Sequence, residues 1–375
     1  MIGQKGLPAT WGGIEHHVEE VGARLVRRGH EVIVYCRAHY STATTAEHRG
    51  MQLVPVWSAN TKHLDAVSHS AACTVRALRD RVDIIHYHAV GPGLVAPLPR
   101  YLSRTKVVLT VHGLDGQRDK WNGAAKIVLQ SAEKMSSFVP HETVVVSKAL
   151  RSHYASRYGR ATTWITNGVD APAAFSAKPV TAPFGLESKS YVLFVGRFVP
   201  EKLPDVLIKA FADVTHDVRL VLAGGSSFSD DYSGRLRAAA DRDARVLLPG
   251  YVHGQALADL YAGAACFVLP SAVEGLPLTL LEAASHGLPV IVSDIAPNVE
   301  VVGVDGPGRR VVPVGDVAAL TAALTAVLDS LSRERLGAVA LRDEVLEQYQ
   351  WDHVTDELEQ VYARVMSRRS SSLVG

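Results

Sequence analysis

Short apolar runs alternate with amphipathic segments along the whole sequence. The runs are rich in Val, Ile and Leu, and a segment of helix length follows most of them. Strands that are apolar throughout are buried on both faces, which is typical of parallel sheets covered by helices. The pattern therefore predicts two α/β domains with doubly wound parallel sheets. The predicted strands are Glu31–Tyr35, Met51–Val56, Val82–His86, Lys106–His112, Glu142–Val146 and Thr162–Ile165, then Ser190–Val195, Arg219–Ala223, Arg245–Leu248, Cys266–Leu269, Pro289–Ser293 and Arg309–Pro313.

Helix and linker signals support this division. Ile14–Arg28 has a helical period and precedes Gly29, a residue favoured just past a helix end. Pro277 stands where the first turn of a helix would begin. Ala171–Leu186 contains three prolines and has no clear period, which indicates a linker. The tail Asp352–Met366 predicts a further amphipathic helix.

We therefore expect two Rossmann-like domains that face each other across a cleft. The predicted parts are an N-terminal domain over residues 1–170, a linker over 171–186, a C-terminal domain over 187–347, and a C-terminal helix over 348–375 that crosses back to the first domain. Only Met1 and Ile2 precede the first glycine, although a doubly wound sheet begins with a central strand. Either the native start lies upstream, which we favour, or this strand is a stub.

Composition narrows the class of protein. Hydrophobic residues make up 47% and charged residues 21% of 375, which indicates a globular chain long enough for two domains. No run reaches the roughly 18 apolar residues of a membrane span. The three cysteines are too few and too scattered for a disulfide framework or a zinc site, so we expect a reducing cytoplasm.

Charge is divided unevenly between the halves. Residues 1–185 hold 22 basic and 13 acidic residues, a net charge of +9, whereas the remainder holds 17 and 25, a net charge of −8. A basic half favours an anionic partner, such as a phosphate-bearing substrate or an anionic membrane surface. Ordinary surface variation is the alternative. No segment combines dense basic residues with aromatic ones, so nucleic-acid binding has no support.

A glycine-rich loop, Gly3–Gly13, stands directly before the first predicted helix. Glycines let the backbone approach a ligand, and a helix N-terminus favours an anion. The loop lacks the G-x-G-x-x-G pattern, and Arg37 stands where an NAD site would have an acidic residue. The segment predicts an anion-binding loop rather than a dinucleotide site. A tight turn without a ligand is the alternative.

The segment FVGRFVPEK places Arg197 just past a predicted strand and Lys202 five residues later. Two cations at the mouth of a sheet can neutralise a diphosphate without a metal ion. We therefore predict no metal and no cofactor at this site. The alternative is that both residues are ordinary surface charges.

The segment SAVEGLPLTLLEAASHGLPV carries the sharpest signal. Glu274 precedes a predicted helix and Glu282 lies about one and a half turns inside it. The first-turn amides near Leu276, Leu278 and Thr279 point between the two carboxylates. A nucleotide sugar fits this layout, with the sugar on Glu274, the phosphates on the helix end and the ribose on Glu282. Two solvated glutamates are the alternative.

Histidines end two predicted strands of the first half. His112 closes KVVLTVHG, at the edge where ligands bind in open α/β sheets. His86 and His88 point to one side of a strand end, but no third zinc ligand is indicated, so we expect a structural or substrate-contact role. The Asp-x-Asp pair at Asp241 and Asp243 follows a charged helix, and we interpret it as a solvated terminus.

Together these motifs resemble the retaining glycosyltransferases of family 4, which have the GT-B fold. The resemblance is carried by Arg197 with Lys202 and by Glu274 and Glu282 with seven residues between them. It extends over nearly the whole chain, because VSKAL, TNGVD, LPGYV and the tail QYQWDHV fall in the expected order. The N-terminal GQKGLPATWGGIE resembles a subgroup of bacterial rhamnosyltransferase-like enzymes.

The resemblance implies a role for each candidate residue. Arg197 and Lys202 would hold the donor diphosphate, Glu282 the ribose and Glu274 the transferred sugar.

Further contacts are implied around these four residues. The amides of Gly275 and Leu276 would contact the sugar and His112 its far edge. The Gly12–Gly13 loop would contact the phosphate or the acceptor, and the backbone near Val252 would hold the base.

The resemblance also implies the reaction. A sugar would pass, with retention, from a nucleoside-diphosphate sugar to a hydroxyl of a glycan or a polyprenyl-diphosphate-linked acceptor, and the leaving phosphate would take the acceptor proton. Synthesis of bacterial polysaccharide or envelope glycans would follow, in the cytoplasm or peripherally at the inner face of the membrane.

Three other functions stay open. An NAD(P)-dependent dehydrogenase is disfavoured by the missing fingerprint and by Arg37. A sugar-nucleotide epimerase with the GT-B fold shares the expected site. A non-catalytic sugar-nucleotide-binding subunit is disfavoured because every charged position that the donor needs is occupied.

Overall fold

The computed structural model describes residues 1–9, 12–38, 46–59, 65–114, 123–172, 185–226 and 231–367, with the backbone alone at 123–127. The chain divides into two compact units. Unit 1 comprises Met1–Gly168 and Trp351–Gly375, and unit 2 comprises Val169–Gln350. Most of the predicted linker, 171–186, lies outside the described residues.

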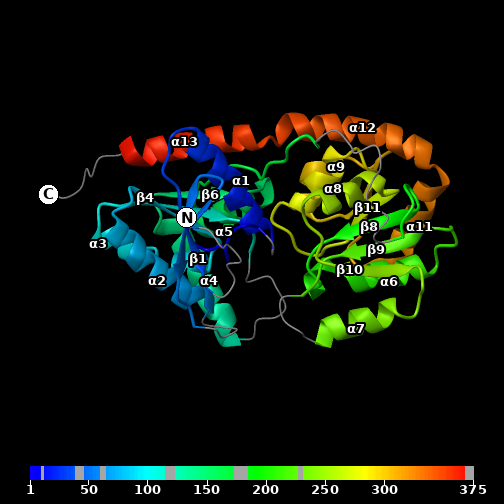
Figure 1. Cartoon of the computed structure of the whole chain (residues 1–375), viewed down its shortest axis with the longest axis horizontal. Helices are drawn as coiled ribbons and strands as arrows, with labels where there is room; N and C mark the ends of the chain where they lie inside the picture. The colour runs from blue at the N-terminus through cyan, green and yellow to red at the C-terminus, as the bar shows by residue number, and fades with distance from the viewer. Residues whose placement is uncertain are drawn as a thin grey trace. The chain divides into compact units, whose positions relative to one another are not determined.

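Unit 1 is built on parallel strands (Figure 1). Its strands are β1 (Ile33–Arg37), β2 (Glu47–His48), β3 (Met51–Val56), β4 (Ile84–His88), β5 (Lys106–Val111), β6 (Glu142–Val145) and β7 (Thr163–Trp164). Strands β4, β5, β6 and β7 pair in that order, and β1 pairs with β3. The short β2 forms an antiparallel pair with β3. It is too brief to produce a hydrophobic pattern, and the sequence did not predict it.

The first two residues lie between β1 and β4. The Ile2 amide donates to the His86 carbonyl at 2.9 Å, and the His88 amide donates to the Ile2 carbonyl at 2.8 Å. On the other side, the Tyr35 amide donates to the Met1 carbonyl at 3.2 Å. Met1 and Ile2 therefore occupy the central position that a doubly wound sheet gives to its first strand.

Helices cover the strands of unit 1. They are α1 (Gly13–Arg27), α2 (Asp65–Asp80), the 3₁₀ helix η1 (Pro92–Val95), α3 (Pro97–Leu102), α4 (Gly123–Phe138), α5 (Lys148–Tyr158) and α13 (Trp351–Ser367). In α1 the buried residues Val18, Val21 and Leu25 recur at helical spacing, and Gly29 follows with a φ of +92°. A left-handed residue after the last turn stops the helix, as the sequence indicated.

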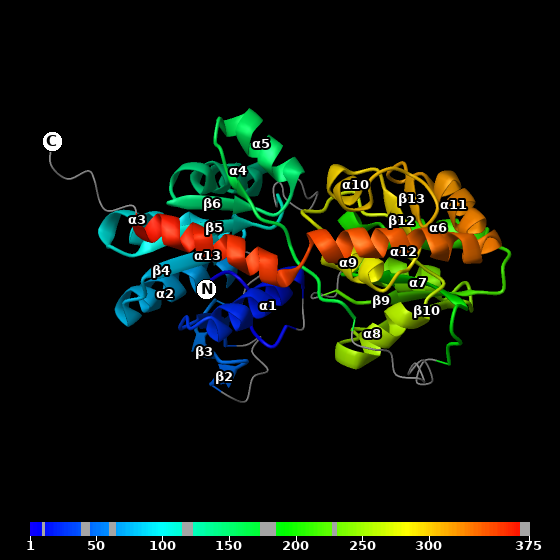
Figure 2. The same ribbon diagram turned by 90° about the horizontal axis from the view of Figure 1, so that it is seen from above.

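The C-terminal helix α13 packs against unit 1 beside α1 (Figure 2). Trp351, at its start, is 1% exposed. Arg24 of α1 contacts Asp352 at 3.2 Å, and Arg28 contacts Asp356 at 2.6 Å and Glu359 at 2.5 Å. Apolar burial of the tryptophan and these ion pairs attach the tail to unit 1.

Unit 2 has one parallel sheet with the order β10-β9-β8-β11-β12-β13. Its strands are β8 (Tyr191–Val195), β9 (Arg219–Ala223), β10 (Val246–Gly250), β11 (Cys266–Leu269), β12 (Val290–Ser293) and β13 (Arg309–Val312). Its helices are η4 (Pro200–Lys202), α6 (Pro204–Ala212), α7 (Asp231–Ala240), α8 (Gly254–Gly263), α9 (Leu278–Ser285), α10 (Ala296–Val302), α11 (Val317–Asp329) and α12 (Leu331–Gln348).

The strand order of unit 2 is that of a dinucleotide-binding doubly wound sheet. Its first strand, β8, is central, with β9 on one side and β11 on the other. The predicted fold class, two α/β units with doubly wound parallel sheets, is confirmed. All the predicted strands are present, with ends shifted by two residues at most. Among the described residues, no helix has both the length and the apolar character that crossing a bilayer requires.

Gly168 tests the attachment of α13. A Cβ at this glycine would lie 2.5 Å from Cδ2 and 2.7 Å from the backbone nitrogen of Trp351. Gly168→Ala should therefore lower the free energy of unfolding of unit 1 by about 2 kcal/mol, because the core is overpacked. Urea unfolding followed by tryptophan fluorescence measures unit 1 alone, since all five tryptophans belong to it.

Gly91→Ala is the matched control in the same unit. A Cβ there meets no atom within 4 Å, so the unfolding midpoint should stay within error or rise slightly. Equal midpoints for the two variants would show that Trp351 does not pack on Gly168 as described.

Candidate functional site

The sheet of unit 2 reverses its winding between β8 and β11. These strands are neighbours, with Val192 opposite Cys266. Their following loops therefore leave the same edge side by side, which is where open α/β sheets bind ligands. The loop after β8 holds Arg197 and Lys202, and the loop after β11 holds Glu274 and Gly275.

The loop after β8 touches the loop after β9. The Phe198 amide donates to the Gly225 carbonyl at 2.9 Å. Gly224 has a φ of +146°, and a Cβ there would lie 1.8 Å from the Gly196 carbonyl oxygen. Only glycine permits this approach. The contact holds the segment that carries Arg197, whose side chain is half-buried.

Lys202 and Glu274 form an ion pair between Nζ and Oε1. Their side chains are only 16% and 9% exposed. The Ala272 amide also donates to the Glu201 carbonyl at 2.9 Å, so backbone and side chains join the two loops. The structure therefore brings together a predicted phosphate-binding cation and the predicted sugar-binding carboxylate, which the sequence analysis gave separate ligands.

Helix α9 begins directly after this loop. Pro277 is its N-cap, and the amides of Leu278 and Thr279 fall in the first turn, where the helix supplies no acceptor. Leu276 and Leu278 are 4% and 8% exposed, so their side chains belong to the core while their backbone forms the loop and the helix end. An anion at this end would be favoured by the helix dipole.

Glu282 is oriented by a buried tyrosine. The Tyr261 hydroxyl, from α8, donates to Glu282 Oε2 at 2.8 Å and lies 3.4 Å from the Thr279 carbonyl. Burial raises the pKa of Tyr261 well above its ordinary value, so this phenol stays protonated and donates. Glu282 is therefore a positioned carboxylate rather than a solvated one. The sequence alone does not indicate Tyr261, because no regular spacing connects it to the motif that contains Glu282.

Val252 follows β10, two strands from β8 in the sheet. Its neighbour Tyr251 packs on the loop after β9, since a Cβ at Gly225 would lie 2.7 Å from Tyr251 Cε2. The structure thus places Val252 at the carboxyl edge that also carries Gly225 and Arg197.

The predicted anion loop of unit 1 is held by carboxylates. Gly12 is the extended N-cap of α1, and Gly12 and Gly13 are exposed. Glu15 accepts from the Lys5 amide at 2.8 Å, and Glu19 accepts from the Ala9 amide at 2.6 Å. These two amides are therefore occupied, and an anion would be left with the backbone near Gly12 and Gly13.

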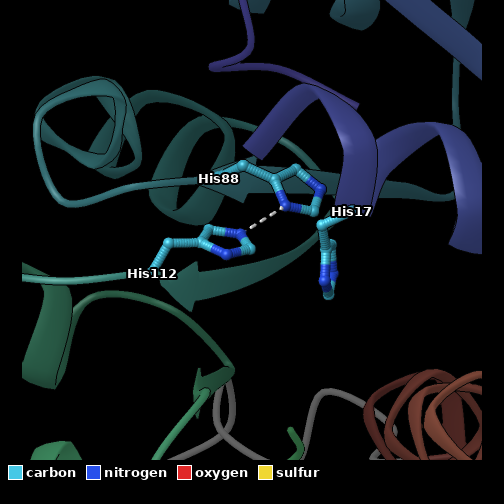
Figure 3. Close-up of side chains that lie close together, drawn as sticks. All are labelled: His17, His88 and His112. Carbon is cyan, nitrogen blue, oxygen red and sulfur yellow. Dashed lines mark hydrogen bonds between the residues drawn. The ribbon is translucent and has the colours of Figure 1, made fainter. Parts of the chain in front are cut away.

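Three histidines of unit 1 lie together (Figure 3). His88 ends β4, His112 follows β5, and His17 comes from α1. His88 Nδ1 and His112 Nε2 are 3.1 Å apart, and the rings of His17 and His112 are 4.7 Å apart. One nitrogen from each lies within 4.8 Å of the others, a spacing that a metal ion could bridge after adjustment. Helix α1 brings His17 to the strand ends, so His88 has two histidine neighbours that the sequence did not indicate.

Hydrogen bonds fix the surrounding rings. His17 Nδ1 lies 3.0 Å from Asn167 Oδ1. His86 is bonded at both nitrogens, to the Tyr362 hydroxyl and to Thr110 Oγ1, each at 2.7 Å. His86 is thus a structural member of the core beside the cluster of His17, His88 and His112.

The histidine cluster is uncharged near neutral pH. Burial lowers the pKa of His17 to about 4 and holds the pKa of His86, His88 and His112 well below the ordinary value of 6.5. The cluster therefore offers hydrogen-bond donors and acceptors without net charge, in contrast to the ion pair of unit 2.

These buried histidines should make unit 1 sensitive to acid. The unfolded chain takes up protons below about pH 6.5, whereas folded His17 does so only near pH 4. Stability is therefore complete above pH 6.5 and falls as the pH drops from 6.5 towards 4, by about 3 kcal/mol for His17 alone. Urea unfolding followed by tryptophan fluorescence at pH 7.5 and pH 5 measures the loss.

His353→Gln serves as the control, because this histidine is exposed on α13 and the variant should keep the same pH dependence. An unfolding free energy that stays constant between pH 7.5 and pH 5 would contradict burial of neutral histidines.

Comparison with known families agrees with this architecture. The family described as Glycosyltransferase Family 4 matches residues 11–171, and the family described as Glycosyl transferases group 1 matches residues 189–330. The chain is similar to an alpha-maltose-1-phosphate synthase of Mycolicibacterium smegmatis, with 26% identity covering 97% of this chain and 98% of that protein.

Solved structures share the fold. Sucrose-phosphate synthase from Thermosynechococcus elongatus has a TM-score of 0.84 at 20% identity, covering 96% of this chain and 97% of that one. HepE from Anabaena in complex with UDP-glucose has a TM-score of 0.80 at 17% identity, covering 94% and 96%. None of these three proteins is a rhamnosyltransferase, so the predicted subgroup gains no support from them. The chain is a glycosyltransferase of the GT-B fold, with a family 4 domain over residues 11–171 and a group 1 domain over residues 189–330.

Proposed function

We propose that this glycosyltransferase uses a nucleoside-diphosphate sugar and transfers the sugar with retention. The observation that carries the proposal is the Lys202–Glu274 pair beside the N-terminus of α9, at the point where the sheet of unit 2 reverses. A cation, a carboxylate and a helix end are the groups that a sugar diphosphate needs. The similar HepE structure, which holds UDP-glucose, supports this choice of donor.

Each part of the donor has a partner at this edge of unit 2. Arg197, Lys202 and the first turn of α9 bind the diphosphate. Glu282, held by Tyr261, accepts from the ribose hydroxyls. The backbone near Val252 contacts the base.

The sugar has partners of its own. Glu274 and the amides of Gly275 and Leu276 bind it. In unit 1, His112 and the Gly12–Gly13 loop are the groups that we propose to contact a sugar or phosphate oxygen of a substrate.

Lys202 exchanges partners when the donor binds. Its ammonium group is paired with Glu274 in the free protein. A diphosphate with two negative charges attracts Lys202 more strongly, and this frees the Glu274 carboxylate to accept from sugar hydroxyls. The ion pair thus keeps two largely buried charges satisfied until the donor replaces each partner.

Catalysis follows from charge. The bond between the anomeric carbon and the phosphate oxygen breaks, with its electron pair on the nucleoside diphosphate. Arg197, Lys202 and the helix end stabilise the charge that develops there. The acceptor hydroxyl bonds to the anomeric carbon on the same face, and its proton passes to the leaving phosphate.

The acceptor is a hydroxyl of a glycan or of a polyprenyl-diphosphate-linked sugar, in bacterial polysaccharide or envelope glycan synthesis. The net charge of +9 over residues 1–185 supports an anionic acceptor and attachment to an anionic membrane surface. We place the enzyme in the cytoplasm, at the inner face of that membrane. The similar proteins do not favour an epimerase or a silent binding subunit. The sugar transferred is a hexose or rhamnose, and rhamnose is suggested by the N-terminal motif alone.

Substitution of Glu274 and substitution of Glu282 should change the affinity for the nucleoside diphosphate in opposite directions. Glu282→Ala should weaken binding of the free nucleoside diphosphate by about 10- to 150-fold, because a hydrogen bond to a charged group is lost. Glu274→Gln should strengthen that binding, by roughly two- to tenfold, because Lys202 loses its competing partner. Transfer should nevertheless fall in Glu274→Gln. Calorimetry with the diphosphate and a transfer assay measure both effects.

Tyr261→Phe is the matched variant for Glu282. It keeps the carboxylate but removes its donor, so it should weaken diphosphate binding less than Glu282→Ala does. The same affinity profile for Glu274→Gln and Glu282→Ala would refute the separate roles.

Transfer should need no divalent metal. Two cations and a helix end surround the proposed diphosphate position, so activity should persist at full rate in excess EDTA. The assay is run with dialysed enzyme. Complete loss of activity in EDTA, restored by magnesium or manganese, would contradict the proposal.

A further inference from the structure

We propose that His88 fixes the position of the proton on His112, so that His112 presents an N–H donor at Nδ1 to an oxygen of the bound ligand. His88 is then a positioning residue that acts through His112. The identity of the ligand, a glycosyl donor or acceptor, rests on the proposed function, whereas the proton arrangement rests on unit 1 alone.

A hydrogen bond joins the rings of His88 and His112. His88 Nδ1 and His112 Nε2 are 3.1 Å apart, a normal hydrogen-bond distance. Burial holds the pKa of both rings well below the ordinary value, so each carries a single proton near neutral pH. Only two arrangements satisfy the bond. Either His88 Nδ1–H donates to His112, or His112 Nε2–H donates to His88.

The other nitrogen of His88 determines which of the two rings is the donor. Nε2 is buried, and no described residue is bonded to it. If His112 were the donor, the single proton of His88 would lie on Nε2, as a buried N–H without an acceptor. The other arrangement leaves Nε2 as an acceptor without a donor, and buried N–H groups without an acceptor are rarer than buried acceptors without a donor. The proton of His88 is therefore on Nδ1, and His112 Nε2 accepts.

The neighbouring side chains do not supply a hydrogen-bond partner for His88 Nε2. The ring of His86 is the nearest to His88, with centroids 4.2 Å apart, but both its nitrogens are bonded to Tyr362 and Thr110. The backbone of His88 is fixed between two strands, since its amide donates to Ile2 and its strand pairs with β5. The ring therefore stays in place with Nδ1 directed at His112.

The position of the proton on His88 determines the tautomer of His112. With Nε2 accepting, its own proton is on Nδ1, and Figure 3 shows this second nitrogen on the side away from His88. His112 is half-buried, whereas His88 is fully buried. A neutral ring with a low pKa and an N–H directed away from His88 is a hydrogen-bond donor and not a base. This agrees with a mechanism in which the leaving phosphate takes the acceptor proton.

A metal ion is the competing use of this cluster. Its three nitrogens lie within 4.8 Å of one another. A metal on His88 Nδ1 would move the proton of His88 to Nε2, the buried atom without a partner. Histidine ligands nearly always donate their other N–H to an acceptor, so the hydrogen-bonded arrangement is favoured.

The direct test is nuclear magnetic resonance on the whole chain labelled with ¹⁵N-histidine, with and without zinc. The proposal predicts the Nδ1–H tautomer at both His88 and His112, because the hydrogen bond at one nitrogen determines which tautomer a histidine adopts. The Nε2–H tautomer at His112 would overturn it. So would tight binding of one zinc ion per chain that shifts the signals of His17, His88 and His112 together.

Two substitutions separate positioning from simple packing. In His88→Asn the side-chain amide nitrogen replaces Nδ1, so the donor to His112 survives and most of the transfer activity should remain. In His88→Leu the donor is lost, and kcat should fall about tenfold with unchanged affinity for the free nucleoside diphosphate. Equal activity of the Asn and Leu variants would overturn the proposal.

The proposed function and the proton arrangement at His112 can be refuted independently of each other. A protein that binds no nucleotide sugar but shows Nδ1–H at His112 would refute the proposed function and support the proton arrangement. An active transferase with Nε2–H at His112 would do the reverse.

Discussion

The ion pair of Lys202 and Glu274 is the interaction on which the site in unit 2 depends. Both side chains are largely buried, and an unpaired charge in such a position costs several kcal/mol. Each charge therefore needs a partner at every stage. In the free protein the two satisfy each other, and in the proposed complex a phosphate and a sugar hydroxyl replace them. The pair satisfies both charges in the free protein, and under the proposed function it favours a ligand that carries both a phosphate and a sugar hydroxyl.

The surrounding fold explains why this pair forms. Strands β8 and β11 are neighbours in the sheet but are separated by two other strands in sequence. Their loops meet only because the sheet reverses its winding at β8. The glycines after β8 and β9 allow the backbones to touch, and α9 starts where the loop after β11 ends. The sheet thus delivers a cation, a carboxylate and a helix end to one edge.

Unit 1 carries neutral side chains, rather than charged ones, at the equivalent edge of its own sheet. The cluster of His17, His88 and His112 is neutral, so these rings supply directed hydrogen bonds without adding charge. A neutral donor suits the hydroxyls of a sugar, whereas the charged groups of unit 2 suit phosphates. The carboxylates Glu15 and Glu19 accept from the amides of Lys5 and Ala9 in the loop before α1, so these two amides serve the fold.

Much of the fold could be predicted from the sequence, because continuous apolar strands and helix-ending glycines are local signals. Strand β2 was not predicted, because two residues are too few to show a hydrophobic period. The spacing of Glu274 and Glu282 identified α9, but it could not show that Lys202, 72 residues away, pairs with Glu274. Tyr261 and His17 reach their partners through helix packing, which no local pattern records.

A crystal structure of the chain with an intact nucleoside-diphosphate sugar would show whether Lys202 and Glu274 exchange partners when the donor binds. We predict that Lys202 Nζ leaves Glu274 and lies about 3 Å from a phosphate oxygen, while the Glu274 carboxylate accepts from a sugar hydroxyl. A complex in which Lys202 and Glu274 remain paired, with the diphosphate bound elsewhere, would contradict it.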